Sequence, residues 1–370
     1  MNKKLMAVAV AGALAVPAIA FAQASNVQIS GRAQLTFANA KASGATISGN
    51  DLKSRNRVDD NSSRIRFRGS ENLGGGLRAI FLMEAGVNMD TGDASRGATG
   101  YPASREAYVG LAGSWGQLTL GKQNVWWTNF ADQTQANYIN HGLQYATGGN
   151  SAGVAWALTR IPNDIKYTSP NWNGFRVFAN YAPNTASESA GAGADADGTH
   201  VGLSAAYLSR MWIAQFDWAQ NEEAGPSPFT RTGTKFGVGW KYQPSAILSL
   251  ILIKLENENV GGVSGRDSEV SSWQLNWSHM MGKWQWIAQV GANGDRKGSL
   301  KASNTGSKGF TVAAKYHFSK RTGAYISFTK VTNESAGGYD YRGGGSPVGM
   351  TGATAGADPQ IFGIGIQHNF

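Results

Sequence analysis

The feature that most constrains this chain is a one-by-one alternation of apolar and polar residues, which recurs from about residue 26 to the end. Residues 235–242 are typical, with Phe236, Val238, Trp240 and Tyr242 on one side and Lys235, Gly237, Gly239 and Lys241 on the other. Successive side chains of a β-strand point to opposite faces, so this period predicts strands with two unlike faces.

Sixteen such segments can be recognised, each about ten residues long and bounded by Gly, Asn, Asp or Ser. They start near Asn26, Ser62, Gly76, Ser104, Gly116, Asn163, Gly174, Gly198, Met211, Arg231, Ala246, Asp267, Lys283, Ser307, Thr322 and Gln360. Links of a few residues alternate with long polar links, which cover 41–61, 89–103, 126–162, 183–197, 221–230 and 335–359. This order predicts an up-and-down sheet. The segment 246–257 is apolar on both faces, so its orientation stays open.

A soluble β-sandwich and a membrane barrel both use alternating strands, but they differ in strand length and in the polar face. Strands near ten residues, an even strand number and alternating short and long links favour the barrel. Trp212, Trp218, Tyr242, Trp277, Trp284 and Tyr316 lie near segment ends, as in interfacial girdles, although ordinary core residues are the alternative. We therefore predict an all-β, 16-stranded antiparallel transmembrane β-barrel with long extracellular loops and short periplasmic turns.

Composition agrees with a barrel rather than with a bundle of membrane helices. The mean hydropathy is −0.30, and no segment after the N-terminus approaches the roughly 20 apolar residues of a membrane helix. The absence of cysteine excludes disulfides and thiol chemistry.

The N-terminus has the pattern of a secretory signal. Lys3 and Lys4 precede an uncharged stretch over residues 5–22, which closes with Ala20-Phe21-Ala22. Ala22-Gln23-Ala24 offers a second cleavage site, and a membrane anchor is the alternative interpretation. We predict a signal peptide over 1–22 and a barrel domain over 23–370, which lowers the formal charge from +9 to +7 because two lysines are removed.

Four stretches resemble one family, the Gram-negative general porins of the neisserial and β-proteobacterial (Burkholderiales) type. Residues 62–81 and 105–123 look like two hairpins of that family, residues 164–175 look like a strand junction, and residues 362–370 look like its C-terminal strand. Gln34, Lys122 and Arg66 depart from the residues common there.

The resemblance implies a homotrimeric outer-membrane channel for passive diffusion of small hydrophilic solutes and ions, with residues 126–153 folded inward as loop 3. Arg64 and Arg105 match wall arginines near the family's pore constriction, and Arg66, Arg68 and Arg78 share their face by alternation. Loop 3 contains one acid, Asp132, and no Lys or Arg. We therefore expect weak anion preference. The alternative is that Glu71, Glu84 or Glu106 neutralises these arginines, or that the arginines face periplasmic water.

The last strand carries a further expectation. Phe362, Ile364, Ile366, His368 and the terminal Phe370 alternate in the way that resembles the signal for the outer-membrane assembly machinery. The expected partners are this machinery, outer-membrane lipid and lipopolysaccharide, a homotrimer and small solutes. Nucleic acid is not expected, because the basic residues form no patch interleaved with aromatics.

No catalytic, metal or cofactor motif emerges. The five histidines are scattered, and Gly116 to Lys122 resembles a phosphate loop but lacks the following Ser or Thr and lies within a strand pattern. Ser, His and Asp are plentiful on the links, but no motif pairs them. We expect no enzyme and no cofactor. Two other functions stay open: a substrate-selective channel using Trp126, Trp127, Tyr138 and Tyr145, and a barrel-anchored adhesin or structural protein.

Overall fold

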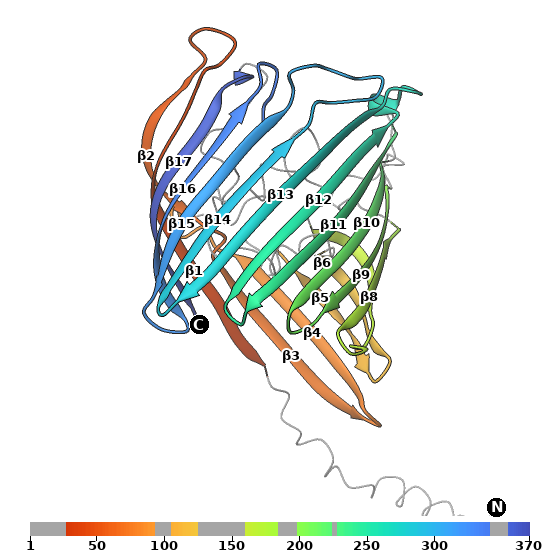
Figure 1. The fold of residues 1–370 in the computed structure, drawn as a ribbon. Helices are drawn as coiled ribbons and strands as arrows, with labels where there is room; N and C mark the ends of the chain where they lie inside the picture. Colours follow the sequence, from red (N-terminus) through yellow and green to blue (C-terminus); the bar gives the residue numbers. More distant parts are fainter. Residues whose placement is uncertain (1–26, 93–104, 125–159, 184–197, 224–227, 341–353) are drawn as a thin grey trace, which may run out of the picture.

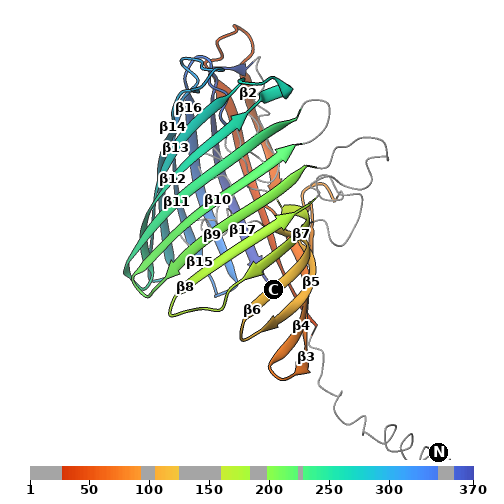
Figure 2. The same cartoon turned by 90° about the vertical axis from the view of Figure 1, so that its right-hand side faces the viewer.

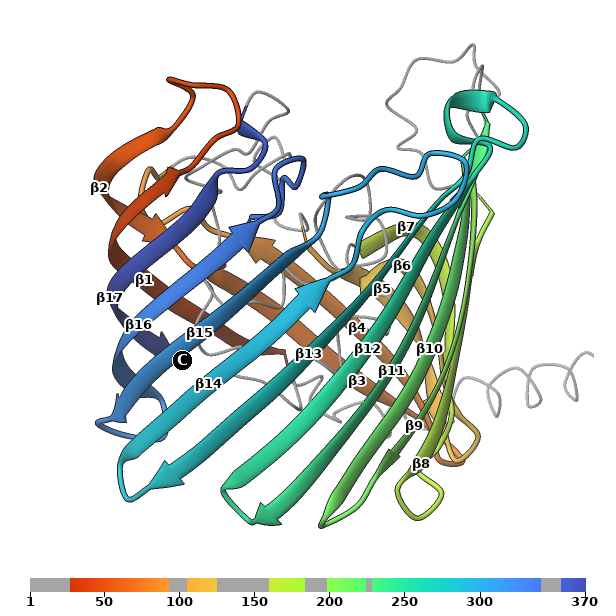
Figure 3. The ribbon, with the colours of Figure 1, turned by 45° about the horizontal axis from the view of Figure 1, so that its top comes forward.

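The computed structural model describes residues 27–92, 105–124, 160–183, 198–223, 228–340 and 354–370. These residues form one antiparallel sheet whose strands are arranged as a ring (Figures 1 and 3). The strands are β1 (Gln28–Ser43), β2 (Leu52–Asp60), β3 (Arg64–Gly74), β4 (Leu77–Gly86), β5 (Ala107–Gly113), β6 (Gly116–Asn124), β7 (Arg160–Thr168), β8 (Phe175–Ala182), β9 (Thr199–Leu208), β10 (Trp212–Glu223), β11 (Phe229–Gln243), β12 (Ala246–Glu258), β13 (Ser268–Met281), β14 (Trp284–Asn293), β15 (Ser307–His317), β16 (Thr322–Asn333) and β17 (Asp358–Asn369). A short 3₁₀ turn, η5 (Val260–Gly262), follows β12.

The sheet closes because its first and last strands pair. β1 lies antiparallel to β17 from Arg32 opposite Asn369 to Ser43 opposite Asp358. The other strands pair with their neighbours along the chain, except that β2 and β3 both pair with β1 instead of with each other. Because β1 and β17 pair, the sheet has no unpaired first or last strand, as closure in lipid requires.

Two of the labelled strands, β2 and β3, form a single barrel strand that is interrupted by a bulge. Both pair with β1, with Leu35 opposite Asp60 and Arg32 opposite Arg64. Two residues of β1 therefore face three residues, 61–63, of the other strand, and Ser62 has a φ of 62°. The backbone N–H of Asn61 donates to Gln34 O at 2.9 Å across the bulge. The barrel thus has sixteen strands, as predicted.

The predicted link over 41–61 is wrong over most of its length. β1 continues to Ser43, β2 starts at Leu52, and only residues 44–51 connect them. The sequence of β2 is polar on both faces, so it lacks the alternation by which the other strands were recognised.

The connections differ at the two ends of the barrel, as predicted. Short turns such as 74–76, 114–115 and 282–283 lie at one end, here named the turn end, together with the C-terminus (Figures 1 and 2). The longer links that the structure describes in full, 44–51, 259–267 and 294–306, lie at the opposite end, here named the loop end. In the described part of the chain, no helix has the length and apolar character needed to cross a membrane.

The two faces of the wall differ in polarity. On β11, Phe236 is 47% exposed on the outer face, whereas Lys235 on the inner face is 3% exposed. Strand β12, whose orientation the sequence left open, follows the same rule: Leu248 and Leu252 point outward, and Ser249 and Ile251 are buried on the inner face.

Aromatic side chains gather on the outer face at the turn end of β10–β15. The rings of Trp284 and Tyr316 are 5.0 Å apart, and those of Trp212 and Trp240 are 6.2 Å apart. Trp277 Nε1 donates to the Tyr242 hydroxyl at 2.8 Å. Five of the six predicted girdle aromatics lie here, an arrangement typical of a membrane interface. The sixth, Trp218, lies further along β10, opposite Leu203 and Thr234.

Candidate functional site on the inner barrel wall

A buried carboxylate at the loop end of β4 is the centre of a cluster of arginines. Glu84 lies on the inner face with only 1% of its side chain exposed. Arg66 is its direct cross-strand neighbour on β3, donating from Nε at 2.9 Å and forming an ion pair through Nη2. Arg105 Nε lies 2.5 Å from the other carboxylate oxygen. Bonds between charged partners are among the strongest that side chains form, so Glu84 fixes both arginines.

Two more arginines border the same carboxylate. Arg64 Nε lies 3.7 Å from Glu84 Oε2, and Arg160 Nη2 lies 3.9 Å from Oε1. Arg160 begins β7, so the cluster joins β3, β4 and β7. We name Arg64, Arg66, Arg105 and Arg160 with Glu84 the arginine cluster.

The backbone holds Arg105 in place although it precedes β5. The Arg105 N–H donates to Glu84 O at 2.9 Å, and the Glu84 N–H donates to Glu106 O at 2.7 Å. These two bonds extend the β4–β5 ladder beyond the last paired strand residues, Met83 and Ala107. The position of the Arg105 side chain is therefore set by the sheet.

The cluster carries an excess of three positive charges, because four guanidiniums surround one carboxylate. Arg32 adds to this charge, because it lies opposite Arg64 on the same face. The sequence offered Glu71, Glu84 and Glu106 as acids that could neutralise the arginines. Of these three, Glu84 is the one that pairs with the arginines of the cluster. Glu106 accepts the N–H of Asn124 at 3.1 Å, and Glu71 lies on the outward parity of β3, opposite Ala79.

Three of the five predicted wall arginines, Arg64, Arg66 and Arg105, come together at Glu84. The other two lie on the inner face nearer the turn end. Arg68 faces Leu82 and donates from Nε to Gln28 Oε1 at 2.9 Å. Arg78 is exposed opposite Asn72, beside the 74–76 turn.

Sequence reasoning missed Arg32 and Arg160. Arg32 precedes Gln34 and Thr36 by an even number of residues, so strict alternation would have found it. Arg160 had no such signal, because it was assigned to a long link. The predicted loop 3 residues, Asp132, Trp126, Trp127, Tyr138 and Tyr145, lie outside the described residues.

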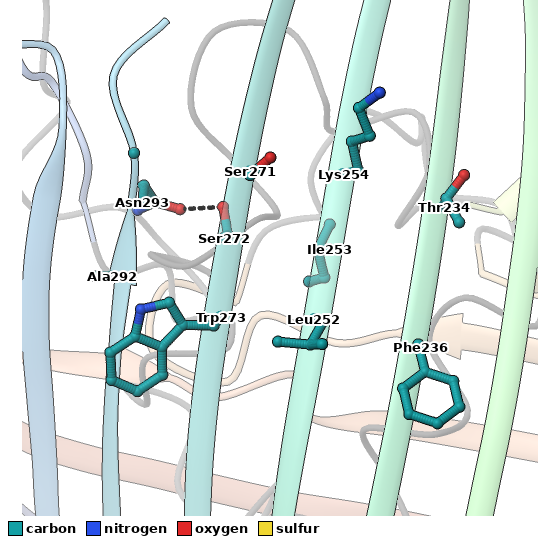
Figure 4. Close-up of a pocket in the computed structure, with 11 residues that line it drawn as sticks. Thr234, Phe236, Leu252, Ile253, Lys254, Ser271, Ser272, Trp273, Ala292 and Asn293 are labelled. Atoms are coloured by element: carbon teal, nitrogen blue, oxygen red, sulfur yellow. Dashed lines mark hydrogen bonds between the residues drawn. The ribbon is translucent and has the colours of Figure 1, made fainter.

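The opposite wall carries few charges, among them Lys315 on β15, which is buried on the inner face and donates to Gln367 Oε1 at 2.8 Å. The inner faces of β12–β16 carry buried amides and hydroxyls that bond to one another, as between Ser272 Oγ and Asn293 Oδ1 at 2.6 Å (Figure 4). On β10 and β11, Lys235 Nζ lies 3.2 Å from Asp217 Oδ2, a balanced pair. Among the described residues, positive side chains are therefore most densely grouped around β1 and β3–β7, where the arginine cluster lies.

The predicted assembly residues share the outer face of β17. Phe362, Ile364, Ile366 and Phe370 are 44–54% exposed, and His368 is exposed beside them. Phe370 N donates to Gly31 O at 3.1 Å, and Gly31 N donates to Phe370 O at 2.9 Å, so the last residue takes part in closure.

A closed, polar-lined barrel with an apolar exterior and a charged inner wall defines an outer-membrane channel. The family model of the Gram-negative porins matches residues 7–336 of this chain. The chain therefore belongs to this family. It is thus an outer-membrane porin whose barrel forms a channel for passive diffusion of small hydrophilic solutes.

Individual relatives agree with the family. Outer membrane porin protein 32 of Delftia acidovorans is 28% identical over 325 residues, which are 84% of this chain and 85% of the relative. Major outer membrane protein P.IB of Neisseria gonorrhoeae is 28% identical over 223 residues, 60% of this chain and 57% of the relative.

Solved structures show the same fold. The anion-selective porin from Comamonas acidovorans has a TM-score of 0.76 at 24% identity, covering 94% of this chain and all of that one. OmpT of Vibrio cholerae in its trimer form has a TM-score of 0.64 at 15% identity, with the same coverage of both chains.

Proposed function

We propose that the channel weakly prefers anions and that the arginine cluster sets this preference at the pore constriction. The observation that carries the proposal is the ratio at Glu84, where one carboxylate stands against four arginines. Arg68 and Arg78 extend the positive wall toward the turn end. Rings and rows of one sign of charge raise the local concentration of the opposite ion.

The relatives add support. One structure of the same fold is described as an anion-selective porin. We assign loop 3, with Asp132, Trp126, Trp127, Tyr138 and Tyr145, to the opposite side of this constriction, on the resemblance alone.

The test is the reversal potential of the purified protein in a planar bilayer under a KCl gradient. An anion-selective reversal potential is expected, and it should decrease when Arg64 and Arg66 are both replaced by Gln. Arg266→Gln, on the 259–267 link, removes a charge of the same kind far from the cluster and serves as the control. Cation preference of the native channel would exclude the proposal, and absence of conductance would favour the adhesin or structural alternative.

We also infer the remaining features of the functional protein. Cleavage after Ala22 releases a mature barrel of residues 23–370, and mass spectrometry of the purified protein distinguishes this site from Ala24. The porin assembles as a homotrimer in lipid and lipopolysaccharide, and Phe362, Ile364, Ile366, His368 and Phe370 are its signal to the assembly machinery. It acts without catalysis or cofactor. Size-exclusion chromatography with light scattering measures the oligomer.

A further inference from the structure

The bulge between β2 and β3 changes which residues of that strand face inward. On the turn side of the bulge, Arg64 faces Arg32 and Arg68 faces Gln28. On the loop side, Arg57 faces Ala38 and Arg55 faces Ala40. The four β1 partners all have even residue numbers and lie on the inner face of β1. On the bulged strand, by contrast, the inward residues have even numbers on the turn side of the bulge and odd numbers on the loop side.

The exposures confirm the change of face. Ala38 and Ala40 are buried on the inner face of β1. Their outward neighbour Phe37 is 57% exposed, and Val58, opposite Phe37, is 52% exposed. A one-residue insertion moves every side chain beyond it to the other face. Without the bulge, Arg55 and Arg57 would point toward lipid.

The result is two runs of inner-face arginines on one barrel strand, Arg55 and Arg57 on the loop side of the bulge and Arg64, Arg66 and Arg68 on the turn side, which we together name the arginine track. The bulge lies between the two runs, and the β1 partners of Arg57 and Arg64 are six residues apart, about 20 Å of strand. Their β1 partners run from Ala40 to Gln28, which corresponds to about 40 Å of strand. Asp59, also inward-facing, is paired with Arg57. Arg55, at the loop end, is exposed.

We propose that the arginine track captures polyvalent anions, meaning solutes with two or more phosphate or carboxylate groups, and that Arg55 is their first contact at the loop end. This rests on the proposed anion-preferring channel and adds a substrate class and an entry site. Inward residues two positions apart are about 7 Å from each other along the strand. Within each run, an anionic group can therefore engage the next arginine before another group on the same solute leaves the previous one. The planar guanidinium suits phosphate and carboxylate equally.

The experiment measures block of chloride current by tripolyphosphate in a planar bilayer, added first to the loop-end side and then to the turn-end side. Arg55→Gln should weaken loop-side block about fivefold, the size of one exposed charge contact, and leave turn-side block unchanged. Arg57 is left intact, because its removal would leave the Asp59 carboxylate behind.

A matched control exchanges two neighbouring residues. Asn56 faces Asn39 on the outer side, with Asn39 Nδ2 donating to Asn56 Oδ1 at 2.8 Å. The double variant Arg55→Asn with Asn56→Arg keeps composition and net charge but moves the arginine to the outer face. It should lose loop-side block as Arg55→Gln does.

The outcomes separate the two proposals. Native-strength block in the exchanged variant would overturn the arginine track, because total charge rather than face would then suffice. An anion-selective reversal potential with equal block in native protein and Arg55→Gln would also overturn the arginine track while leaving the proposed selectivity intact. A cation-selective native channel would remove the proposed function itself. Arg55→Gln changes an exposed side chain, so its result does not depend on the folding of the exchanged variant.

Discussion

Arg32 on β1 and Arg64 on β3 lie directly opposite each other, two like charges on one face of an antiparallel pair. Like charges in this position destabilise a sheet. Arg32→Gln should therefore stabilise the barrel by about 0.2–1 kcal/mol while it reduces anion preference. Urea unfolding in lipid measures the first effect and the reversal potential measures the second. A less stable variant would mean that Arg32 makes a net favourable contribution to the wall.

Glu84 should have the opposite effect on selectivity. Glu84→Gln removes the only carboxylate of the arginine cluster, so the reversal potential should shift further toward the anion value. The barrel should lose about 1.5–3 kcal/mol, because the charged hydrogen bonds to Arg66 and Arg105 are weakened. Glu71→Gln, on the outer parity of β3, is the matched control. A shift toward cations would contradict our interpretation of the cluster.

The Tyr325 hydroxyl should stabilise the barrel without affecting conduction. It lies 2.5 Å from Thr36 Oγ1 and accepts from Gln34 Nε2 and Asn61 Nδ2, each at 3.1 Å, beside the bulge. Tyr325→Phe leaves buried polar groups without this partner, which costs about 1–3 kcal/mol. Thermal unfolding measures the loss. Tyr316→Phe, on the outer face, should be close to native, and equal stability of the two variants would refute the role of the hydroxyl.

Closure should depend on the absence of a side chain at Gly31. A Cβ at this position would lie 2.3 Å from Phe370 Cζ and 2.5 Å from Arg64 O. Gly31→Ala should therefore reduce the yield of heat-modifiable, folded barrel on gels. Gly75→Ala is the comparison variant. It lies in an open turn where an added Cβ has no atom within 4 Å, so it tests the effect of backbone strain without a steric clash. A native yield for Gly31→Ala would show that the closing pair adjusts freely.

The 294–306 link should lose order in acid. Asp295 Oδ1 accepts from the Thr305 N–H at 2.7 Å and the Gly306 N–H at 3.0 Å. These donors, Thr305 first, lower the pKa of the Asp295 carboxyl below its usual value. A lowered folded-state pKa means that the contribution is complete above about pH 4, the value of the unfolded chain. It is lost as the pH falls through the folded-state pKa.

Hydrogen exchange of the Thr305 and Gly306 amides across this range measures the effect. Asp295→Asn should show fast exchange already at neutral pH. Protection that is independent of pH in the native protein would contradict the role of the carboxylate.

Local alternation predicted most of the wall, because the two environments of a barrel act on neighbouring residues of one strand. Strand β11 is the clearest example, with Phe236 outward and Lys235 inward. Strand β2 was not predicted, because Leu52–Asp60 lacks a continuous apolar face. The orientation of β12 needed its partners, since Ile251 and Leu252 are equally apolar and only register distinguishes them.

The arginine cluster was predictable only in part, because its contacts also depend on cross-strand register. Arg64 and Arg66 share a face by parity alone, but their contact with Glu84 depends on how β3 and β4 align. Arg160 is brought to the same carboxylate from 76 positions further along the chain. Alternation predicts which face a side chain occupies; cross-strand register decides which side chains meet.

The pairing of β1 with β17 has a consequence for how the barrel is made. These strands are the two ends of the described chain, so their contacts have the greatest sequence separation in the molecule. Contacts of this kind are slow to form, because most of the chain must be ordered before its ends can meet. Each shorter pair can form as a local hairpin, but the ring is sealed only at the end. The slowest step of folding is therefore the one that converts an open sheet, with two exposed edges, into a pore.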